Sequence, residues 1–196
     1  MKSWMPLAAA VVLAGPALAA PAAAETGAAA HIAAYDDKVV AIMKSGLPMP
    51  ARVARFQALV AQSYDMPAIA ALVIGPGWAS APAADRAAAI AALTRHSAIS
   101  LARNFKSWSG ERFTIDPAVQ QRGPDSIVKV TISGSGSDIL YFRLHRAGTG
   151  WSIVDVISGG VSQLAVQRSD LASTAATGGA GAVAKRLAQV DAKAGS

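Results

Sequence analysis

Two polar residues near the end of the chain have types that can do chemistry. Asp155 stands between two valines of an apolar run, and Ser162 follows a pair of glycines. The order Gly160-Val161-Ser162 is similar to the start of the nucleophile elbow of serine hydrolases, where a histidine activates the serine. Leu164 replaces the second glycine of that motif, however, and no histidine follows Ser162. We therefore interpret the stretch as a structural joint, with Ser162 in the first turn of a helix.

Asp155 is the acid most suited to act as a general base, because it interrupts a run that reads as a buried strand. A buried carboxylate needs a charged or hydrogen-bonding partner. We expect this partner to be an arginine or the amides of a helix rather than a substrate. Other acids that offer a carboxylate are Asp36, Asp37, Asp65, Asp85 and Asp116.

Two further patterns are too weak to predict a site. Gly134-Ser135-Gly136 begins like a dinucleotide fingerprint, but Ile139 stands where the third glycine belongs and the segment joins two predicted strands. The three histidines, His31, His96 and His145, are far apart and have no metal-ligand spacing. We expect no catalytic residue, no metal and no cofactor.

The start of the chain predicts export. Residues 1–24 combine an early lysine, an apolar run and small-residue cleavage sites, which is typical of a secretory signal peptide. We expect 25–30 to be a flexible start and 31–192 to form a single domain. The sequence of 196 residues has no cysteine, and its net charge of +6 comes from scattered basic residues. This favours a free protein of the bacterial periplasm, without a nucleic acid partner.

Helical spacing dominates the first half of the domain and returns after Gly160. Apolar residues at steps of three and four predict helices over 31–45 and 50–63, a third from Asp65 with Leu72 on its buried face, and a long one from Pro82 to about Trp108. A helix after Gly160 should break at Gly178-Gly179.

Between these helices the apolar period is two, which predicts strands. The links between the second, third and fourth strands are short and glycine-rich, so these strands should pair antiparallel. Helices, then strands, then helices indicate an α+β fold. We expect a twisted four-stranded antiparallel sheet packed against the N-terminal and C-terminal helices. The strands are marked by Phe113 and Ile115, by Val128, Val130 and Ile132, by Leu140, Phe142 and Leu144, and by 153–157.

The chain resembles the MlaC/Ttg2D family of periplasmic phospholipid-binding proteins, once called toluene-tolerance proteins. The resemblance covers about 31–190 and rests on the segment 150–162, on Arg168-Ser169, Gly178-Gly179 and Leu187, and upstream on Asp65, Ile69, Gly75 and Trp78. Residues 162–165 with 168–170 are most similar to the hopanoid-associated HpnM branch. The chain departs from the family at Ala102 and Leu171, where aromatic residues are common. The resemblance therefore does not determine the volume of the pocket or the identity of the ligand.

This resemblance implies a fold that encloses a deep apolar pocket for lipid tails. It implies a carrier that moves phospholipid or hopanoid between the inner and outer membranes, as part of an ABC-type transport system. Its partners would be an inner-membrane MCE/ABC transporter complex and an outer-membrane lipoprotein complex. The residues expected to contact the lipid are Leu72, Trp78, Ile90, Leu93, Leu101, Phe105, Val128, Val130, Ile132, Leu140, Phe142, Leu144, Val154 and Val156.

Two other functions are compatible with the sequence. An enzyme of hopanoid metabolism could use the same apolar cone, with Asp155 as its base. An adaptor could have a filled core and bind only proteins. A carrier and an enzyme both need a cavity, and an adaptor does not.

Overall fold

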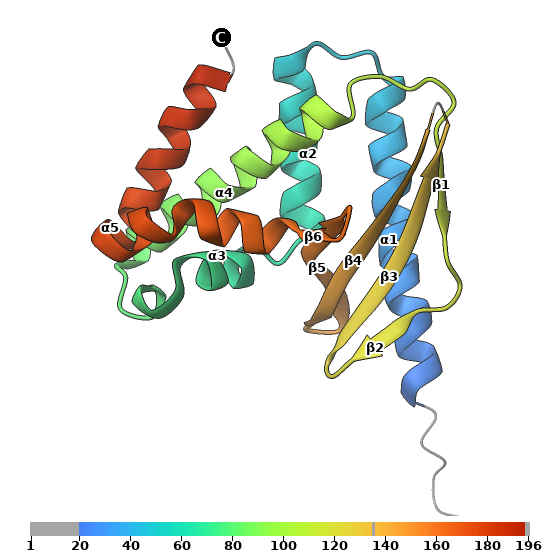
Figure 1. Ribbon diagram of the computed structural model, residues 1–196, viewed down its shortest axis with the longest axis horizontal. Coiled ribbons are helices and arrows are strands. Elements are labelled where there is room, and N and C mark those ends of the chain that lie inside the picture. Colours follow the sequence, from blue (N-terminus) through green and yellow to red (C-terminus); the bar gives the residue numbers. More distant parts are fainter. Residues whose placement is uncertain (1–19, 135, 195–196) are drawn as a thin grey trace, which may run out of the picture.

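The computed structural model describes residues 20–134 and 136–194, and within them helices precede strands and a long helix follows (Figure 1). The α+β prediction is confirmed. None of the helices in these ranges is both long and apolar enough to cross a bilayer. The elements are α1 (Ala20–Lys44), α2 (Met49–Ser63), α3 (Met66–Ile74), the 3-10 helix η1 (Gly75–Trp78), α4 (Ala83–Asn104), β1 (Arg112–Ile115), β2 (Gln120–Arg122), β3 (Asp125–Ser133), β4 (Ser137–Ala147), β5 (Gly150–Ser158), β6 (Val161–Ser162) and α5 (Gln163–Ala194).

The sheet has the order β1-β3-β4-β5-β6, with β2 paired to β3, and its pairs are antiparallel. The four predicted strands correspond to β1, β3, β4 and β5, and the described residues add β2 and β6. The expected count of four is therefore too low. The sequence of β2 is polar, and β6 has only two residues, so neither strand is long enough to show a period of two.

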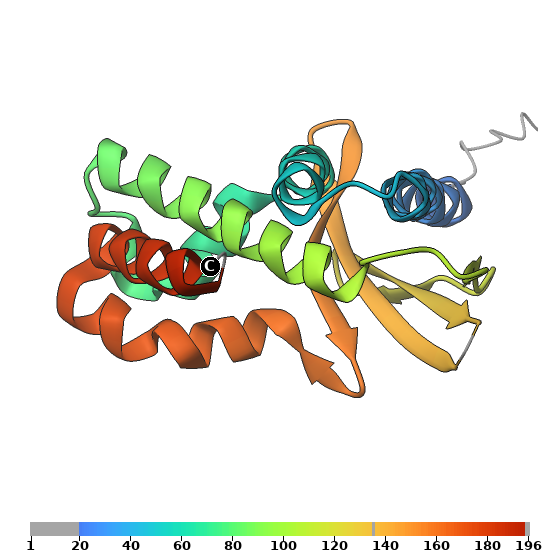
Figure 2. The same cartoon turned by 90° about the horizontal axis from the view of Figure 1, so that it is seen from above.

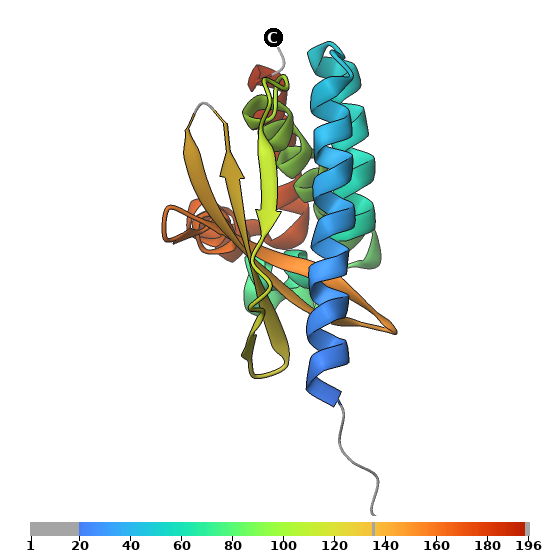
Figure 3. The same cartoon turned by 90° about the vertical axis from the view of Figure 1, so that its right-hand side faces the viewer.

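The strand register places the predicted apolar residues on one face. Val128 lies opposite Phe142, and Val130 lies opposite Leu140. This inner face packs against α1, which runs along the sheet with α2 beside it (Figure 3). The core formed there contains fully buried residues from both layers: Ile32 and Val39 of α1, Phe56 of α2, and Val128, Val130, Leu144 and Ile153 of the sheet.

A second apolar core lies away from the sheet, where α3, α4 and α5 meet (Figure 2). Leu93 of α4 and Val183 of α5 are fully buried in it. The predicted break of the last helix is confirmed, because Gly179 has φ 60° and ψ −153° in the middle of α5. The kink turns the second half of α5 back over α4, and both halves of α5 contribute to this core.

The first helix begins earlier than expected. Residues 25–30, predicted as a flexible start, are part of α1, and Ala28 is fully buried. Trp151 packs so closely on Gly27 that an added Cβ would lie 2.9 Å from its indole nitrogen. The alanines of this segment favour a helix but give no apolar period, so the periodicity missed it. Most of the predicted signal peptide, residues 1–19, lies outside the described residues.

The kink in α5 yields a first prediction. The dihedral angles of Gly179 suit glycine, and a Cβ there costs about 1–3 kcal/mol. Gly179→Ala should lower the free energy of unfolding by this amount in urea denaturation. Gly77→Ala is the matched control, because Gly77 has open space around it and no positive φ. Equal stability of the two variants would contradict a kink held by Gly179.

Candidate functional site

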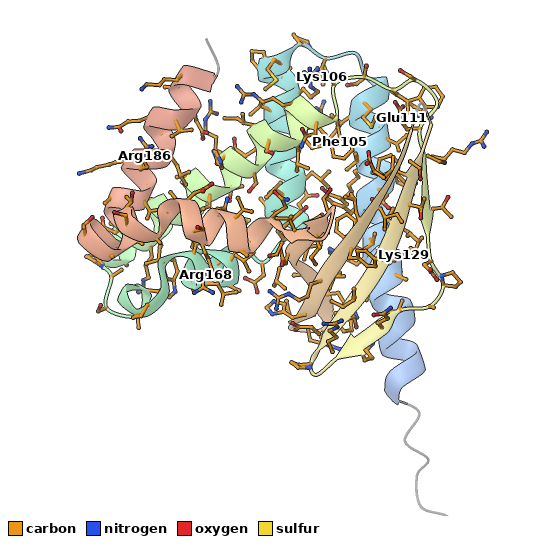
Figure 4. The ribbon with its side chains drawn as sticks, in the orientation of Figure 1. Phe105, Lys106, Glu111, Lys129, Arg168 and Arg186 are labelled. Atoms are coloured by element: carbon orange, nitrogen blue, oxygen red, sulfur yellow. The ribbon has the colours of Figure 1, made fainter. Side chains whose placement is uncertain are left out.

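A cavity of about 630 Å³ lies between the inner face of the sheet and the helices α1, α3, α4 and α5. Figure 4 shows Phe105, one of its lining residues, just after the end of α4. Most of the wall is aliphatic or aromatic. The apolar lining residues are Val39, Ile69, Leu101, Phe105, Phe113, Leu140, Phe142, Val154, Val156, Leu164, Val166, Leu171, Leu187 and Val190.

The structure brings six of the fourteen predicted lipid contacts together around this cavity. Leu101 and Phe105 come from the last turn of α4 and the residue after it, Leu140 and Phe142 come from β4, and Val154 and Val156 come from β5. Phe142 also packs edge-on against the ring of Tyr35 in α1, with 5.7 Å between ring centroids.

Four sheet residues of the prediction lie outside the cavity wall. Val128, Val130 and Leu144 are fully buried in the core against α1 and α2, and Ile132 is partly buried at its edge. They share the inner face with the lining residues, as predicted. The helices α1 and α2 cover part of this face, so the sheet contributes to the wall through β4 and β5 residues and through Phe113 of β1.

Four helical residues of the prediction also lie elsewhere. Leu93 is fully buried in the second core, and Trp78 and Ile90 pack against that core. Leu72, expected on a buried face, is 42% exposed. The first half of α4 packs on α3 and α5, and only its last turns reach the cavity. Periodicity identifies an apolar face but not the neighbour that each part of the face contacts.

Asp155 forms the structural joint that the sequence predicted. One carboxylate oxygen accepts a hydrogen bond from Ser162 Oγ at 2.6 Å, and the other accepts from the backbone amide of Leu164 at 3.0 Å. Ser162 Oγ in turn accepts from the amide of Ala165. Asp155 and Ser162 therefore accept hydrogen bonds from free amides at the start of α5. Helix amides were among the partners expected for Asp155.

The position of Asp155 follows from a bulge in β5. Leu144 lies opposite Ile153, whereas Arg143 lies opposite Asp155, so Val154 is an additional residue in the strand. A bulge bends its strand and turns side chains to new directions. As a result Val154, Asp155 and Val156 all line the cavity, although they are consecutive.

Asp36 is the site residue that the sequence analysis did not single out. It lies on α1, lines the cavity and is only 5% exposed. Neither of its carboxylate oxygens has a hydrogen-bond partner among the described residues. Burial, with a smaller effect of the neighbouring Asp37, raises the pKa of Asp36 from 3.8 to about 7. The sequence did indicate that Asp36 is buried, because it stands four residues after Ile32 and three before Val39, which places it on the same face of the helix as these two residues.

Beside Asp36, two tyrosines line the cavity. The hydroxyls of Tyr35 and Tyr64 form a hydrogen bond of 3.2 Å, and the two rings meet edge to face. Burial raises the pKa of Tyr64 to about 12, and it raises the pKa of Tyr35 well above its usual range. Both hydroxyls are therefore protonated at neutral pH, and one bond between them uses one of their two hydrogens.

The three histidines lie apart and contact other groups. His145 Nε2 lies 2.8 Å from Asp65, whose other oxygen accepts from the amide of Ala68 at the start of α3. His96 Nδ1 lies 2.7 Å from the buried Asp191, which joins α4 to α5. His31 Nε2 lies 2.9 Å from the carbonyl oxygen of Ser63. These contacts hold helices in place.

The family model of the MlaC protein matches residues 34–189, which is most of the chain and includes the cavity-lining residues except Val190. The chain belongs to the MlaC family. The resemblance noted in the sequence is thereby confirmed, whereas the HpnM branch stays a prediction. No curated protein shows a significant sequence match to the chain.

A solved structure supports the MlaC fold. The chain is similar to the phospholipid-binding protein from Ralstonia solanacearum in complex with a phospholipid, with a TM-score of 0.71 and 18% sequence identity. The match covers 86% of this chain and 99% of that protein. At this identity the likeness establishes the fold.

The joint yields a second prediction. Asp155→Ala leaves the amide of Leu164 without its acceptor, and hydrogen bonds to a charged group contribute about 1.5–3 kcal/mol each. The variant should therefore lose roughly 2–4 kcal/mol of stability in urea denaturation. Asp170→Ala is the control, because Asp170 is an exposed residue of the same helix. An Asp155 variant as stable as the control would contradict the joint.

The buried acid yields a third prediction. Because folding raises the pKa of Asp36, the folded protein keeps a proton that the unfolded chain loses above about pH 4. Stability should fall between about pH 4 and pH 7, by on the order of 4 kcal/mol. Urea denaturation of lipid-free Asp36→Asn should show a more stable protein than the wild type at pH 8 and a weaker dependence on pH.

Asp37→Asn is the control for this measurement, because Asp37 is the exposed neighbour of Asp36. Its stability should keep most of the wild-type dependence on pH, because burial is the larger cause of the raised pKa of Asp36 and the charge of Asp37 the smaller one. Parallel profiles of wild type and Asp36→Asn from pH 4 to pH 8 would show that Asp36 is not the titrating group.

Proposed function

We propose that this MlaC family protein is a lipid carrier of the bacterial periplasm, which holds the apolar part of one lipid in the cavity. The observation that carries the proposal is the cavity itself. Its volume of about 630 Å³ is within the range of ligand pockets, about 300–1,000 Å³. Aliphatic and aromatic side chains from the sheet and from four helices converge on it, and six of them were expected to contact lipid.

Transfer of a lipid through water requires an apolar cavity of this kind. A lipid with about 30 buried CH₂ groups loses on the order of 24 kcal/mol of hydrophobic stabilisation when its tails enter water, at about 0.8 kcal/mol per CH₂. Free diffusion through the aqueous periplasm is therefore negligible. A cavity lined by Leu101, Phe142 and Val156 offers the tails surroundings similar to the membrane interior, so exchange between membrane and carrier is nearly isoenergetic.

The rim of the cavity suits a polar head group. Gln163, Asp170 and Arg186 line the cavity and are exposed, and all three belong to α5. Arg186 lies on the second half of α5 (Figure 4). A lipid with its tails among the sheet residues would thus keep its head group near water and near both charges. The exposed Val166 provides an apolar contact beside this rim.

The proposal includes the route and the partners. The signal-peptide pattern of residues 1–24 supports export to the periplasm. A carrier without its own energy source needs partners that set the direction of transfer, and we propose an inner-membrane MCE/ABC transporter complex and an outer-membrane lipoprotein complex. The cargo is a phospholipid or a hopanoid. The Ralstonia solanacearum protein of the same fold holds a phospholipid, which favours the first.

The structure weakens both alternatives that the sequence allowed. Asp155 was the expected base of a lipid-modifying enzyme, but both of its oxygens accept hydrogen bonds at the start of α5. An adaptor requires a filled core, whereas this fold keeps a cavity between sheet and helices.

The fourth prediction tests the cavity with two neighbouring residues on opposite faces of β4. Leu140 lines the cavity, and Ile139 points to the other face and is 43% exposed. In Leu140→Trp the indole fills space that lipid tails need, and each lost CH₂ contact is worth about 0.8 kcal/mol. Its dissociation constant for dioleoylphosphatidylglycerol should rise at least roughly tenfold in a fluorescence displacement assay.

Ile139→Trp is the matched control and should bind this lipid as the wild type does. Circular dichroism of both variants establishes that the fold is intact. Equal affinities of Leu140→Trp and the wild type would show that the lipid does not occupy the cavity.

A further inference from the structure

We propose that Asp36, together with the hydroxyl pair of Tyr35 and Tyr64, forms a polar floor in the cavity that recognises one oxygen atom of the bound lipid. In this arrangement the carboxyl group of Asp36 donates a hydrogen bond to a carbonyl or hydroxyl oxygen of the lipid. The inference rests on the proposed function, since it assigns a specificity-determining residue to the same cavity.

The first argument is the position of Asp36. Its side chain borders the cavity from α1, between the buried Tyr35 and Val39, which also line the cavity. A buried polar group without a hydrogen bond is costly, and such groups in folded proteins nearly always have a partner. Both oxygens of Asp36 lack a partner within the described residues. The cavity is the place from which a ligand can supply one.

The second argument concerns the form of the carboxyl group. Burial raises the pKa of Asp36 to about 7, so a large fraction of the molecules hold it neutral at neutral pH. The neutral acid has one O–H donor, whereas the carboxylate only accepts. A lipid oxygen that accepts this hydrogen selects the neutral form and spares the protein a buried charge. Ester carbonyls and hydroxyls are the oxygen functions that an otherwise apolar lipid can bring to this depth.

The third argument is that the group can reach a ligand. The oxygens of Asp36 are themselves shielded from water, but the torsion that rotates a carboxyl group is broad and costs little. Rotation about this torsion is therefore the movement by which the O–H would be directed toward a ligand in the cavity. The tyrosine pair adds a second donor, because the hydroxyl that accepts the bond between Tyr35 and Tyr64 still has its own hydrogen.

Two matched pairs of lipids test the floor and identify the source of the oxygen. The first pair is dioleoylphosphatidylglycerol and its dioleyl diether analogue, which lacks the two ester carbonyls. The second pair is diplopterol, a hopanoid alcohol, and its parent hydrocarbon hopane. Each is titrated against protein that has been stripped of its own lipid and then loaded with a fluorescent reporter lipid. The wild type should prefer the oxygen-bearing member of at least one pair by about 3- to 10-fold.

Three variants assign the preference to Asp36. Asp36→Leu is apolar and of similar size and should lose most of the preference, since only the tyrosine pair remains as a donor, and Asp36→Ala repeats this test if the leucine variant does not fold. Asp36→Asn keeps an N–H donor and should retain most of the preference. Asp37→Asn, at the exposed neighbour, should behave as the wild type.

Each outcome is decisive. A preference for the diester assigns the floor to a glycerolipid ester, and a preference for diplopterol assigns it to a hopanoid hydroxyl. Equal binding within both pairs by the wild type would overturn the polar floor and leave the carrier function intact, and so would a preference that survives undiminished in Asp36→Leu and Asp36→Ala. Failure of all four lipids to bind the wild type would overturn the carrier function itself.

Discussion

The joint between β5 and α5 determines where the cavity lies. The bulge at Val154 turns Asp155 toward the start of α5, where its carboxylate and Ser162 satisfy free amides of the helix. These bonds fix the direction in which α5 leaves the sheet. The kink at Gly179 then returns the helix over α4, and the two halves of α5 form the wall that faces β4 and β5. Without this wall the inner face of the sheet would be open to water on the side that α1 and α2 leave uncovered.

The same chain thus divides its apolar residues between two tasks. Fully buried residues such as Val130 and Leu93 pack in two cores and hold the layers together. Residues at the boundary of these cores, such as Leu101 and Val156, are only partly covered and face the cavity. Asp36, which has no hydrogen-bond partner among the described residues, lies in that wall as well, and the burial that raises its pKa opposes its ionised form. A protein that merely needed stability would gain from an apolar residue there, which is why we assign the acid a role in recognition.

Much of this fold follows from the sequence, and the limits have physical reasons. The alternation of Val128, Val130, Leu140 and Phe142 predicts the strands and their shared face, and glycine pairs predict the turns and the kink. The pattern does not reveal which part of a face a distant helix covers, so Val128 and Leu140 look equivalent in sequence and have different neighbours in space. Short strands such as β6 depend on pairing partners. Asp36 was detectable by its spacing, but the chain offers many acids, and only the fold shows which of them is buried without a hydrogen-bond partner among the described residues.

The central claim is that the cavity carries a lipid, and native mass spectrometry of the protein purified from the periplasm of its own cells tests it most directly. The account predicts a complex heavier than the polypeptide by the mass of one lipid, and organic extraction should then release a phospholipid or a hopanoid. A well-folded protein that has the mass of the bare chain, and from which no lipid can be extracted, would contradict the account.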